Sequence, residues 1–305
     1  MKLSILVVSK TYSLLNTLFE SISYATDIDN NSIEILCSWN GLESDISLIK
    51  KNFFDNLYIS TVIPYHFASN MNQLLEMAKG EYLILVNDDV IFDIKSIDKG
   101  IECFNQNSNA VLVGSRLRNE KGNLSHAGIL FNLLHRPYHF LEDSIKHDHH
   151  IVSQFSYPVS AVTGALMLTK LEFIKPHRFN TNYLICGEDV ELCLDLRENY
   201  NKDIYCCYEF SAIHQAETTR SQNPEQYKTF KDNLLISGRY LRFLLKSNIS
   251  NIENEFNIIQ RNLKIYKKYR VNKLLLSKNR KWDLTLFILS YYIKLVIFIR
   301  KILMF

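Results

Sequence analysis

The sequence predicts an α/β fold of the mainly parallel type, with helices on both faces of the sheet and a helical region at the C-terminus. Short apolar runs alternate with segments whose apolar residues recur at helical spacing. The runs contain few polar residues, as expected of strands that are buried on both faces. After Pro224 the pattern is helical to the end of the chain. We therefore expect a sheet domain over residues 1–221 and a helical region over residues 222–305, with the boundary near Ser221–Pro224.

Composition narrows the class of protein. Hydrophobic residues make up 47% of the 305 residues, which is enough for a large core and excludes a disordered chain. The net charge of +3 is too small to indicate a nucleic-acid partner, so none is expected. The six cysteines include no C-x-x-C pair, which favours reduced thiols in a cytosolic protein over a zinc site.

The predicted elements follow in order along the chain. The run Leu3–Val8 is too short for a signal peptide and precedes no cleavage site, so we interpret it as the first strand. Apolar residues from Leu15 to Ile22 then recur at helical spacing. The pattern is irregular from Gly114 to Tyr157. Further strands are expected at Ile33–Cys37, Leu57–Ile63, Tyr82–Val86, Ala110–Val113 and Ile204–Tyr208, and further helices at Phe67–Ala78 and Glu188–Asn199.

Asp88 and Asp89 come just after the predicted strand Tyr82–Val86, and sheets of this type bind ligands at the carboxyl ends of their strands. The sequence contains neither a G-x-x-x-x-G-K-[ST] loop nor G-x-G-x-x-G, so no backbone cradle for phosphate is indicated. A bound diphosphate then needs a cation such as Mg²⁺ or Mn²⁺, for which the two aspartates offer oxygen ligands. The alternative for two adjacent aspartates is a solvated turn or a helix cap.

A second acidic motif, Glu188 and Asp189, opens the predicted helix Glu188–Asn199. Carboxylates at this position either stabilise the helix dipole or act as a general base. His214 ends a later apolar stretch. Taken alone, it is either a core histidine or a metal ligand.

In their order and spacing, these motifs resemble those of the inverting family 2 glycosyltransferases, which are nucleotide-diphospho-sugar transferases with the GT-A fold. The resemblance covers the chain from about Leu3 to Arg220. The segments that carry it are Ile5–Lys10, Ile33–Leu36 before Trp39–Gly41, Ala78–Asp89, Val113–Leu117, His126–Ile129, Thr163–Met167, Gly187–Leu194 and Ile213–His214.

The resemblance implies roles for the first acidic motif. Asn87-Asp88-Asp89 matches the D-x-D-type motif of the family, with Asp89 at the metal position and Asp88 beside it in the metal and donor site. Asn87 stands where the first aspartate often stands, so it is expected to make a neutral contact to ribose or to metal-bound water. His214 matches a histidine that often completes the coordination of Mg²⁺ or Mn²⁺ in the family.

The resemblance also assigns the base and the nucleotide site. The Glu188-Asp189 pair matches the E-D motif of the family, with Asp189 the first choice as catalytic base and Glu188 the second. Ser9, Trp39 and Asn40 fall in the segments that bind the donor. Family members commonly carry an aspartate just before Asn-Gly to bind the nucleotide base. Trp39 stands there in this chain, and stacking on the base is expected to replace that hydrogen bond.

The implied activity is a metal-dependent inverting transfer of a sugar from a nucleotide-diphosphate donor to the hydroxyl of a glycan or lipid-linked glycan, in bacterial surface polysaccharide or lipopolysaccharide biosynthesis. One alternative is a catalytically silent, membrane-associated protein that binds nucleotide sugars or serves as a scaffold. Another is a nucleotidyltransferase. It requires a basic, glycine-rich loop after the first strand, which the residues Ser9-Lys10-Thr11-Tyr12 do not provide.

The C-terminal region combines positive charge with apolar residues. Arg261–Lys281 contains nine Lys and Arg and no acidic residue. The apolar runs of Trp282–Phe305 are shorter than the roughly 20 residues of a membrane span. We expect this segment either to lie peripherally on an anionic membrane or to pack as a helix on its own domain or a second subunit. The expected location is the cytoplasm, at the inner face of the cell membrane.

Overall fold

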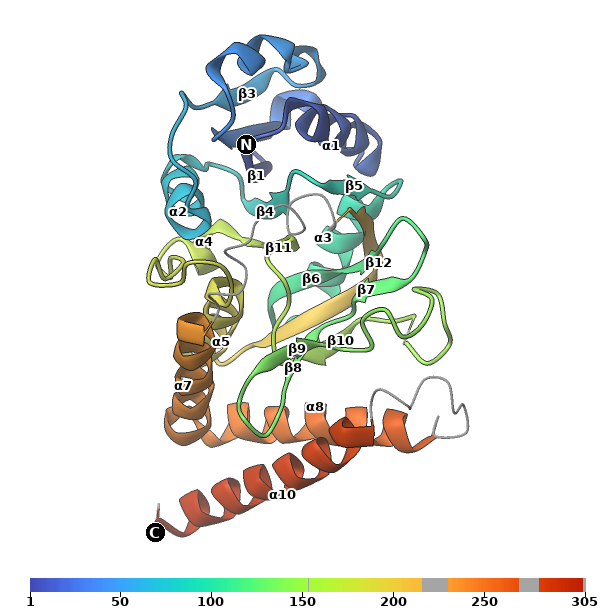
Figure 1. The fold of residues 1–305 in the computed structure, drawn as a ribbon, viewed down its shortest axis with the longest axis vertical. Helices are drawn as coiled ribbons and strands as arrows, with labels where there is room; N and C mark the ends of the chain where they lie inside the picture. Colours follow the sequence, from blue (N-terminus) through green and yellow to red (C-terminus); the bar gives the residue numbers. More distant parts are fainter. Residues whose placement is uncertain (153, 216–229, 269–279, 304–305) are drawn as a thin grey trace.

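The computed structural model describes all residues except 153, 216–229, 269–279 and 304–305 (Figure 1). Among the described residues, ten strands form the main sheet and two form a small second sheet. The main-sheet strands are β1 (Leu3–Ser9), β2 (Ile33–Trp39), β3 (Asn56–Ile59), β4 (Tyr82–Asn87), β5 (Val90–Phe92), β6 (Ala110–Arg118), β7 (Leu124–His126), β10 (Tyr157–Val159), β11 (Leu166–Lys170) and β12 (Asp203–His214). The second sheet pairs β8 (Ile129–Phe131) with β9 (Pro137–His139).

Two parallel groups of strands make up the sheet, whose order is β10-β12-β6-β11-β4-β1-β2-β3. In the first group β1 pairs in parallel with β2 and β4, and β2 with β3. In the second group β6 pairs in parallel with β12. β11 runs antiparallel between β4 and β6 and joins the two groups. The predicted α/β fold with a mainly parallel sheet is confirmed.

Helices cover both faces of this sheet, and each face has its own core. The α-helices are α1 (Tyr12–Ala25), α2 (Phe67–Met77), α3 (Ser96–Gln106), α4 (Leu171–Ile174), α5 (Glu188–Tyr200), α7 (Phe230–Lys246), α8 (Ile249–Lys268) and α10 (Arg280–Leu303). Leu3, Ile5 and Val7 of β1 pack with α1 and α3, whereas Leu6 and Val8 pack with α2 and α5. Alternate residues of a strand point to opposite faces, which explains the continuous apolar run.

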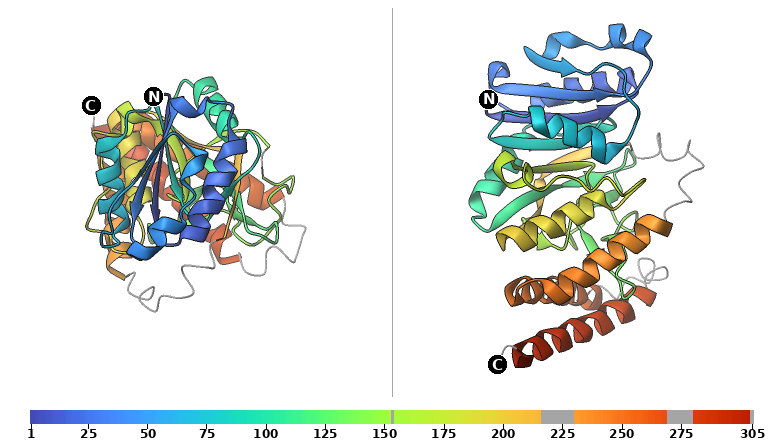
Figure 2. Two further views of the ribbon diagram at one scale, coloured as in Figure 1. Left: turned by 90° about the horizontal axis from the view of Figure 1, so that it is seen from above. Right: turned by 90° about the vertical axis from the view of Figure 1, so that its left-hand side faces the viewer.

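The C-terminal helices share the second of these cores. Ile236 of α7, Ile258 of α8 and Leu289 of α10 belong to the same cluster of buried residues as α2 and α5. The three helices gather at the end of the molecule opposite β3 (Figure 2). They therefore form a further layer on the sheet domain. The predicted boundary at Ser221–Pro224 lies outside the described residues.

Candidate active site

The first site residues meet where β1 and β4 end side by side. Val8 of β1 is paired with Asn87 of β4, so Ser9 and Asp88 follow at neighbouring positions. The Ser9 hydroxyl donates a hydrogen bond of 2.7 Å to Oδ2 of Asp88. Burial raises the pKa of Asp88 to about 6, opposed by the Ser9 hydrogen bond and assisted by the charge of Asp89.

The pairing of β5 with the end of β12 brings Asp89 to His214. Val90 is paired with His214, and the backbone N–H of Gln215 donates to the carbonyl of Asp89 at 3.0 Å. His214 Nε2 consequently lies 3.2 Å from Asp89 Oδ1. The Asp89 side chain is buried, and its Oδ1 accepts no hydrogen bond from any residue that the structure describes. A buried carboxylate oxygen without a donor is costly, so this oxygen is well placed for a cation.

The residues at this position fit a divalent metal ion that also binds the substrate. Asp89 offers an oxygen and His214 a nitrogen, a ligand pair that suits Mn²⁺ and accommodates Mg²⁺. Across the described part of the chain, no group of three or more His, Cys, Asp or Glu side chains is arranged to hold a metal ion. Such an ion would therefore need phosphate oxygens and water to complete its coordination, as is usual for Mg²⁺ sites.

Asp189 is held at the same end of the sheet by the segment that leads into β11. Its Oδ2 accepts a hydrogen bond of 2.7 Å from the backbone N–H of Gly164, and its Oδ1 accepts one of 2.8 Å from Val190. A Cβ atom at position 164 would lie 3.2 Å from that of Asp189, so glycine permits this close approach. The next residue, Ala165, accepts a hydrogen bond of 2.9 Å from the N–H of Asn87. The two acidic motifs of the sequence are thus tied to adjacent residues of one segment.

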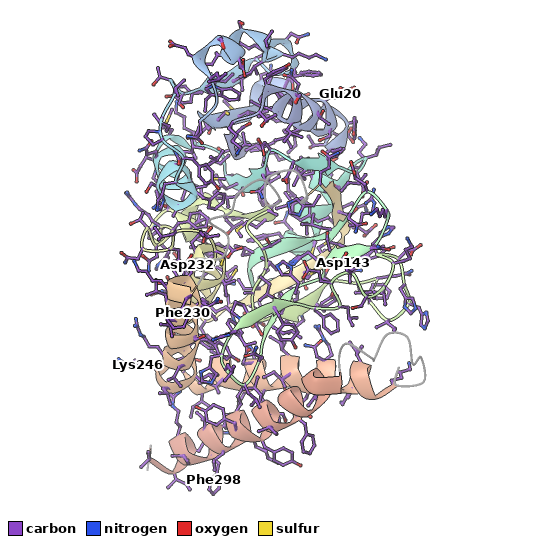
Figure 3. All side chains as sticks on the ribbon, in the orientation of Figure 1. Glu20, Asp143, Phe230, Asp232, Lys246 and Phe298 are labelled. Atoms are coloured by element: carbon purple, nitrogen blue, oxygen red, sulfur yellow. The ribbon has the colours of Figure 1, made fainter. Side chains whose placement is uncertain are left out.

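The loop before α5 is organised by Asp232 of α7, a residue that the sequence did not single out. The Asp232 carboxylate is buried and accepts hydrogen bonds from three successive backbone N–H groups (Figure 3): from Ile185 at 2.8 Å and from Leu184 and Cys186 at 3.2 Å. Gly187 follows in the left-handed region with φ of 109°. This loop sets the position at which α5 begins and hence where Glu188 and Asp189 lie.

The expectation that Trp39 stacks on a nucleotide base needs correction. The indole is fully buried in the core on the side of α1, and its Nε1 donates to the carbonyl of Leu42 at 3.0 Å. A Cβ atom at Gly41 would lie 2.5 Å from the ring, so the indole occupies space that the glycine leaves open. In this conformation Trp39 presents no face to a ligand.

Asn40, by contrast, retains a free acceptor. Its backbone N–H donates to the carbonyl of Ser9 at 2.7 Å, and its side-chain NH₂ donates to the carbonyl of Ile63 at the same distance. Its Oδ1 is buried and accepts no hydrogen bond from the residues that the structure describes. Asn40, directly after β2, is thus tied by its backbone to Ser9 and keeps one oriented amide oxygen.

His126 is a buried histidine whose ring lies against that of His139. Its Nδ1 lies 3.0 Å from Nδ1 of His139, and its Nε2 accepts a hydrogen bond of 3.3 Å from the N–H of Gly128. Burial holds the pKa of His126 well below its ordinary value, assisted by the nearby positive charges of His139, Arg116 and His214. His126 is therefore a neutral side chain. In the sequence it appears only as part of a family motif, without a role.

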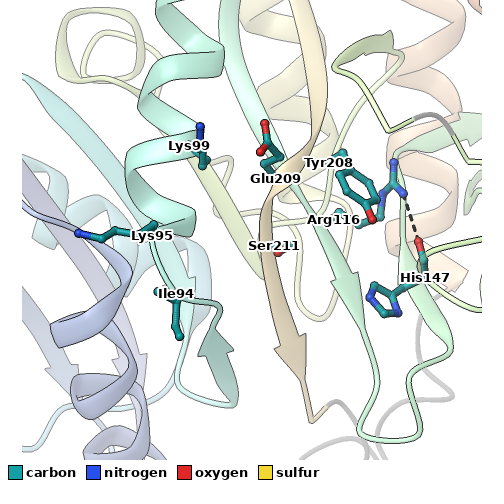
Figure 4. Close-up of a pocket in the computed structure, with 8 residues that line it drawn as sticks. All are labelled: Ile94, Lys95, Lys99, Arg116, His147, Tyr208, Glu209 and Ser211. Atoms are coloured by element: carbon teal, nitrogen blue, oxygen red, sulfur yellow. Dashed lines mark hydrogen bonds between the residues drawn. The ribbon is translucent and has the colours of Figure 1, made fainter.

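A separate pocket of about 280 Å³ lies along β12, outside this site (Figure 4). Its lining comprises Ile94, Lys95, Lys99, Arg116, His147, Tyr208, Glu209 and Ser211. None of the predicted site residues lines it. Lys95 and Lys99 are paired with Asp27 and Glu102.

Comparisons with known proteins identify a family domain in this chain and solved structures with a similar fold. Residues 13–160 match the model of Glycosyl transferase family 2. A search of the curated proteins found no match. The fold is similar to that of the mannosyltransferase PcManGT from Pyrobaculum calidifontis, solved with GDP-Man and Mn²⁺, with a TM-score of 0.53 and 10% identity over 99% of this chain and 87% of that one.

Two further solved structures share the fold. TarS of S. aureus, residues 1–349, gives a TM-score of 0.51 and 15% identity over 97% of this chain and 88% of that one. GalNAc-T7, solved with UDP, GalNAc and Mn²⁺, gives a TM-score of 0.55 and 13% identity over 70% of this chain and 44% of that one. The expectation of a glycosyltransferase is confirmed: residues 13–160 match a glycosyltransferase family 2 domain, and the fold is that of the GT-A glycosyltransferases.

Proposed function

We propose that this glycosyltransferase is metal-dependent and inverting, and that it moves a sugar from a nucleotide diphosphate to an acceptor hydroxyl. The observation that carries the proposal is the meeting of two acidic motifs at one end of the sheet. Asp89 and His214 lie 3.2 Å apart there, and Gly164 holds Asp189 by a hydrogen bond of 2.7 Å. In this proposal Asp89 and His214 bind the leaving diphosphate through the metal ion, and Asp189 activates the acceptor.

The roles of the residues follow from their contacts. Asp89 and His214 would hold Mg²⁺ or Mn²⁺, which when bound supplies positive charge to the leaving diphosphate. Asp189 accepts the proton of the acceptor hydroxyl, whose oxygen forms a bond to the anomeric carbon as the bond to the diphosphate breaks on the opposite face. Each Asp189 oxygen accepts one backbone N–H and keeps lone-pair capacity for this proton. The same two hydrogen bonds fix the orientation of the carboxylate.

The donor is proposed to be a nucleotide-diphosphate sugar. The related folds were solved with GDP-Man and with UDP, which supports a nucleoside diphosphate here. Asn40 Oδ1 and the Ser9–Asp88 pair provide acceptors for hydroxyl or base N–H groups of such a ligand. Asn87 at the end of β4 contributes a neutral polar side chain to the same region.

The acceptor is proposed to be a glycan or lipid-linked glycan of bacterial surface polysaccharide or lipopolysaccharide biosynthesis. The motif resemblance from Leu3 to Arg220 supports this assignment of the pathway. A lipid-linked acceptor also suits a chain whose last helix exposes many apolar side chains.

Turnover provides the direct test of the reaction. The chain is incubated with a panel of nucleotide sugars and oligosaccharide acceptors in Mn²⁺ or EDTA, and released nucleoside diphosphate is measured. We expect release for one donor class, only with the metal, and a product whose anomeric configuration by NMR is opposite to that of the donor. Retained configuration contradicts the inverting mechanism. Thermal stabilisation by a nucleotide sugar without turnover with any acceptor favours the silent binding protein.

Metal dependence is tested separately by binding. Calorimetric titration of nucleoside diphosphate is performed in Mn²⁺ and in EDTA, with wild type, Asp89→Ala and the control Asp55→Ala, whose side chain is exposed. We expect EDTA and Asp89→Ala to weaken binding and Asp55→Ala to leave it unchanged. Equal affinity in every case contradicts a metal at Asp89.

A further inference from the structure

The last helix, α10, exposes an unusual number of large apolar side chains. The residues concerned, here called the apolar face of α10, are Phe287, Ile288, Tyr291, Leu295, Phe298, Ile299, Ile302 and Leu303. Their exposed fractions run from 41% to 77%. Soluble monomers rarely expose contiguous apolar surface of this kind unless it meets a partner or a membrane.

These side chains lie on one side of the helix. With 3.6 residues per turn, they fall within an arc of roughly 160° around the helix axis. Leu289, Ile293 and Val296 lie on the opposite side and are buried, the first two in the core shared with α8. α10 forms the edge of the molecule farthest from β3, and Phe298 points away from the rest of the chain (Figure 3). The apolar face therefore looks outward and is covered by no described part of this chain.

The charges around the apolar face are predominantly positive. In the part of α10 whose side chains the structure describes, residues 287–303, the charged residues are Lys294, Arg300 and Lys301, all of them basic. Lys294 and Lys301 lie along one border of the face, between it and the buried side, and both are exposed. Lys301 pairs with Glu253 of α8.

We propose that α10 docks peripherally on an anionic lipid surface, with its apolar face in the membrane interface. Lys294 can then extend its ammonium group to the lipid phosphates while its stem covers the border of the face, and Lys301 can exchange its exposed pairing with Glu253 for a phosphate. The aromatic residues Phe287, Tyr291 and Phe298 are of the type that favours this region. Among the described residues, no helix has both the length and the apolar character that are needed to cross a membrane.

Charge complementarity favours a membrane over a second copy of this chain. A second copy packed on the same face would bring a second set of lysines to its border, and like charges repel. An anionic bilayer instead attracts these lysines and accepts the apolar side chains. The proposed location is the inner face of the cell membrane. This inference does not depend on the identity of the donor or on the chemistry of sugar transfer.

The test is flotation of the 305-residue chain with vesicles of phosphatidylcholine alone or with phosphatidylglycerol added, at low and at high salt. We expect flotation only with the anionic vesicles at low salt, and release at high salt because screening weakens the attraction. Leu295→Asp should abolish flotation, whereas Leu42→Asp, at another exposed leucine far from α10, should not. Lys294→Glu should reduce flotation, with Lys51→Glu as its control. Circular dichroism verifies that each variant is folded.

Several results would overturn the proposal. The first is that the wild-type chain fails to float with anionic vesicles at low salt. The second is that Leu295→Asp and Leu42→Asp reduce flotation equally. Flotation that resists both high salt and alkaline carbonate excludes peripheral docking. A dimer by light scattering that Leu295→Asp dissociates, without any flotation, assigns the apolar face to a second copy instead.

Discussion

Arg197 of α5 and Glu255 of α8 form an ion pair of 2.8 Å in which both side chains are fully buried. Glu255 also accepts hydrogen bonds from Ser160 and Tyr240, at 2.7 and 2.8 Å. The Arg197 guanidinium lies 4.7 Å from the ring centre of Phe243. These contacts offset part of the cost of removing two charges from water. They also fasten the C-terminal helices to α5, the helix whose first turn contains Asp189.

Removing one partner of this pair should be strongly destabilising. Glu255→Ala leaves the Arg197 charge buried without compensation, and we expect the free energy of unfolding to fall by about 3–5 kcal/mol. The control is Glu253→Ala in the same helix, which removes an exposed pair with Lys301 and should cost less than about 1 kcal/mol. Urea unfolding measures both. A similar fall in the free energy of unfolding in the two variants would show that the buried pair contributes no more to stability than the exposed pair.

Stability should depend on pH through His126. The folded chain keeps this histidine neutral well below pH 6.5, whereas the unfolded chain protonates it as pH falls through that value. The unfolded state then binds more protons, so acidification below pH 6.5 should lower stability by up to about 1.4 kcal/mol per pH unit from this group. Unfolding of His126→Gln at several pH values should show a smaller slope than wild type. An unchanged slope in His126→Gln contradicts the assignment.

Asp189→Asn should stop turnover and leave donor binding nearly intact. A base acts on the acceptor hydroxyl, so its loss appears mainly in kcat, with a reduction of about 10²–10⁴-fold. Steady-state kinetics and calorimetry with the donor separate the two effects, with Glu188→Gln measured in parallel. If Asp189→Asn retains more than about a tenth of the wild-type kcat while the kcat of Glu188→Gln falls below that level, the base is Glu188.

Asp232→Ala should affect both stability and turnover, although this residue is not expected to touch the substrate. Three backbone N–H groups lose their acceptor, and each unsatisfied donor costs about 1–3 kcal/mol if water does not replace it. Because the freed loop precedes Glu188, we expect kcat to fall more than donor affinity. Asp232→Asn keeps one carbonyl oxygen as an acceptor and should retain intermediate activity. The exposed neighbour Lys231→Ala serves as control; an unchanged kcat in Asp232→Ala shows that the loop is positioned by other contacts.

Local sequence patterns predicted much of the sheet and the acidic motifs. Leu3–Val8 became β1, extended by Ser9, because a strand buried on both faces must be apolar throughout. The strand predicted at Leu57–Ile63 is shorter, since β3 ends at Ile59. Asp88, Asp89 and His214 could be named in advance because each ends or follows a recognisable strand.

Features that depend on distant partners could not be predicted. The burial of Trp39 depends on the space left by Gly41 and on the packing beneath α1. Asp232 looks like an ordinary acidic residue in the first turn of a helix, and its role follows from a loop that lies 46 to 48 residues earlier. The sequence shows that the residues of β11 are apolar. It does not show that β11 lies antiparallel between β4 and β6, because that position depends on pairing with distant strands.

The Arg197–Glu255 pair also constrains how the chain folds during its synthesis. The two residues are 58 positions apart, so at 5–20 residues per second Glu255 is added about 3–12 seconds after Arg197. Until then, the nascent sheet domain must either leave the Arg197 side chain in water or bury it unpaired. If Arg197 stays in water, the core beneath α5 cannot close while the chain is still attached to the ribosome. We expect arrest peptides that stall the nascent chain before α8 has emerged to yield a protease-sensitive sheet domain, and stalling after α8 has emerged to yield a resistant one.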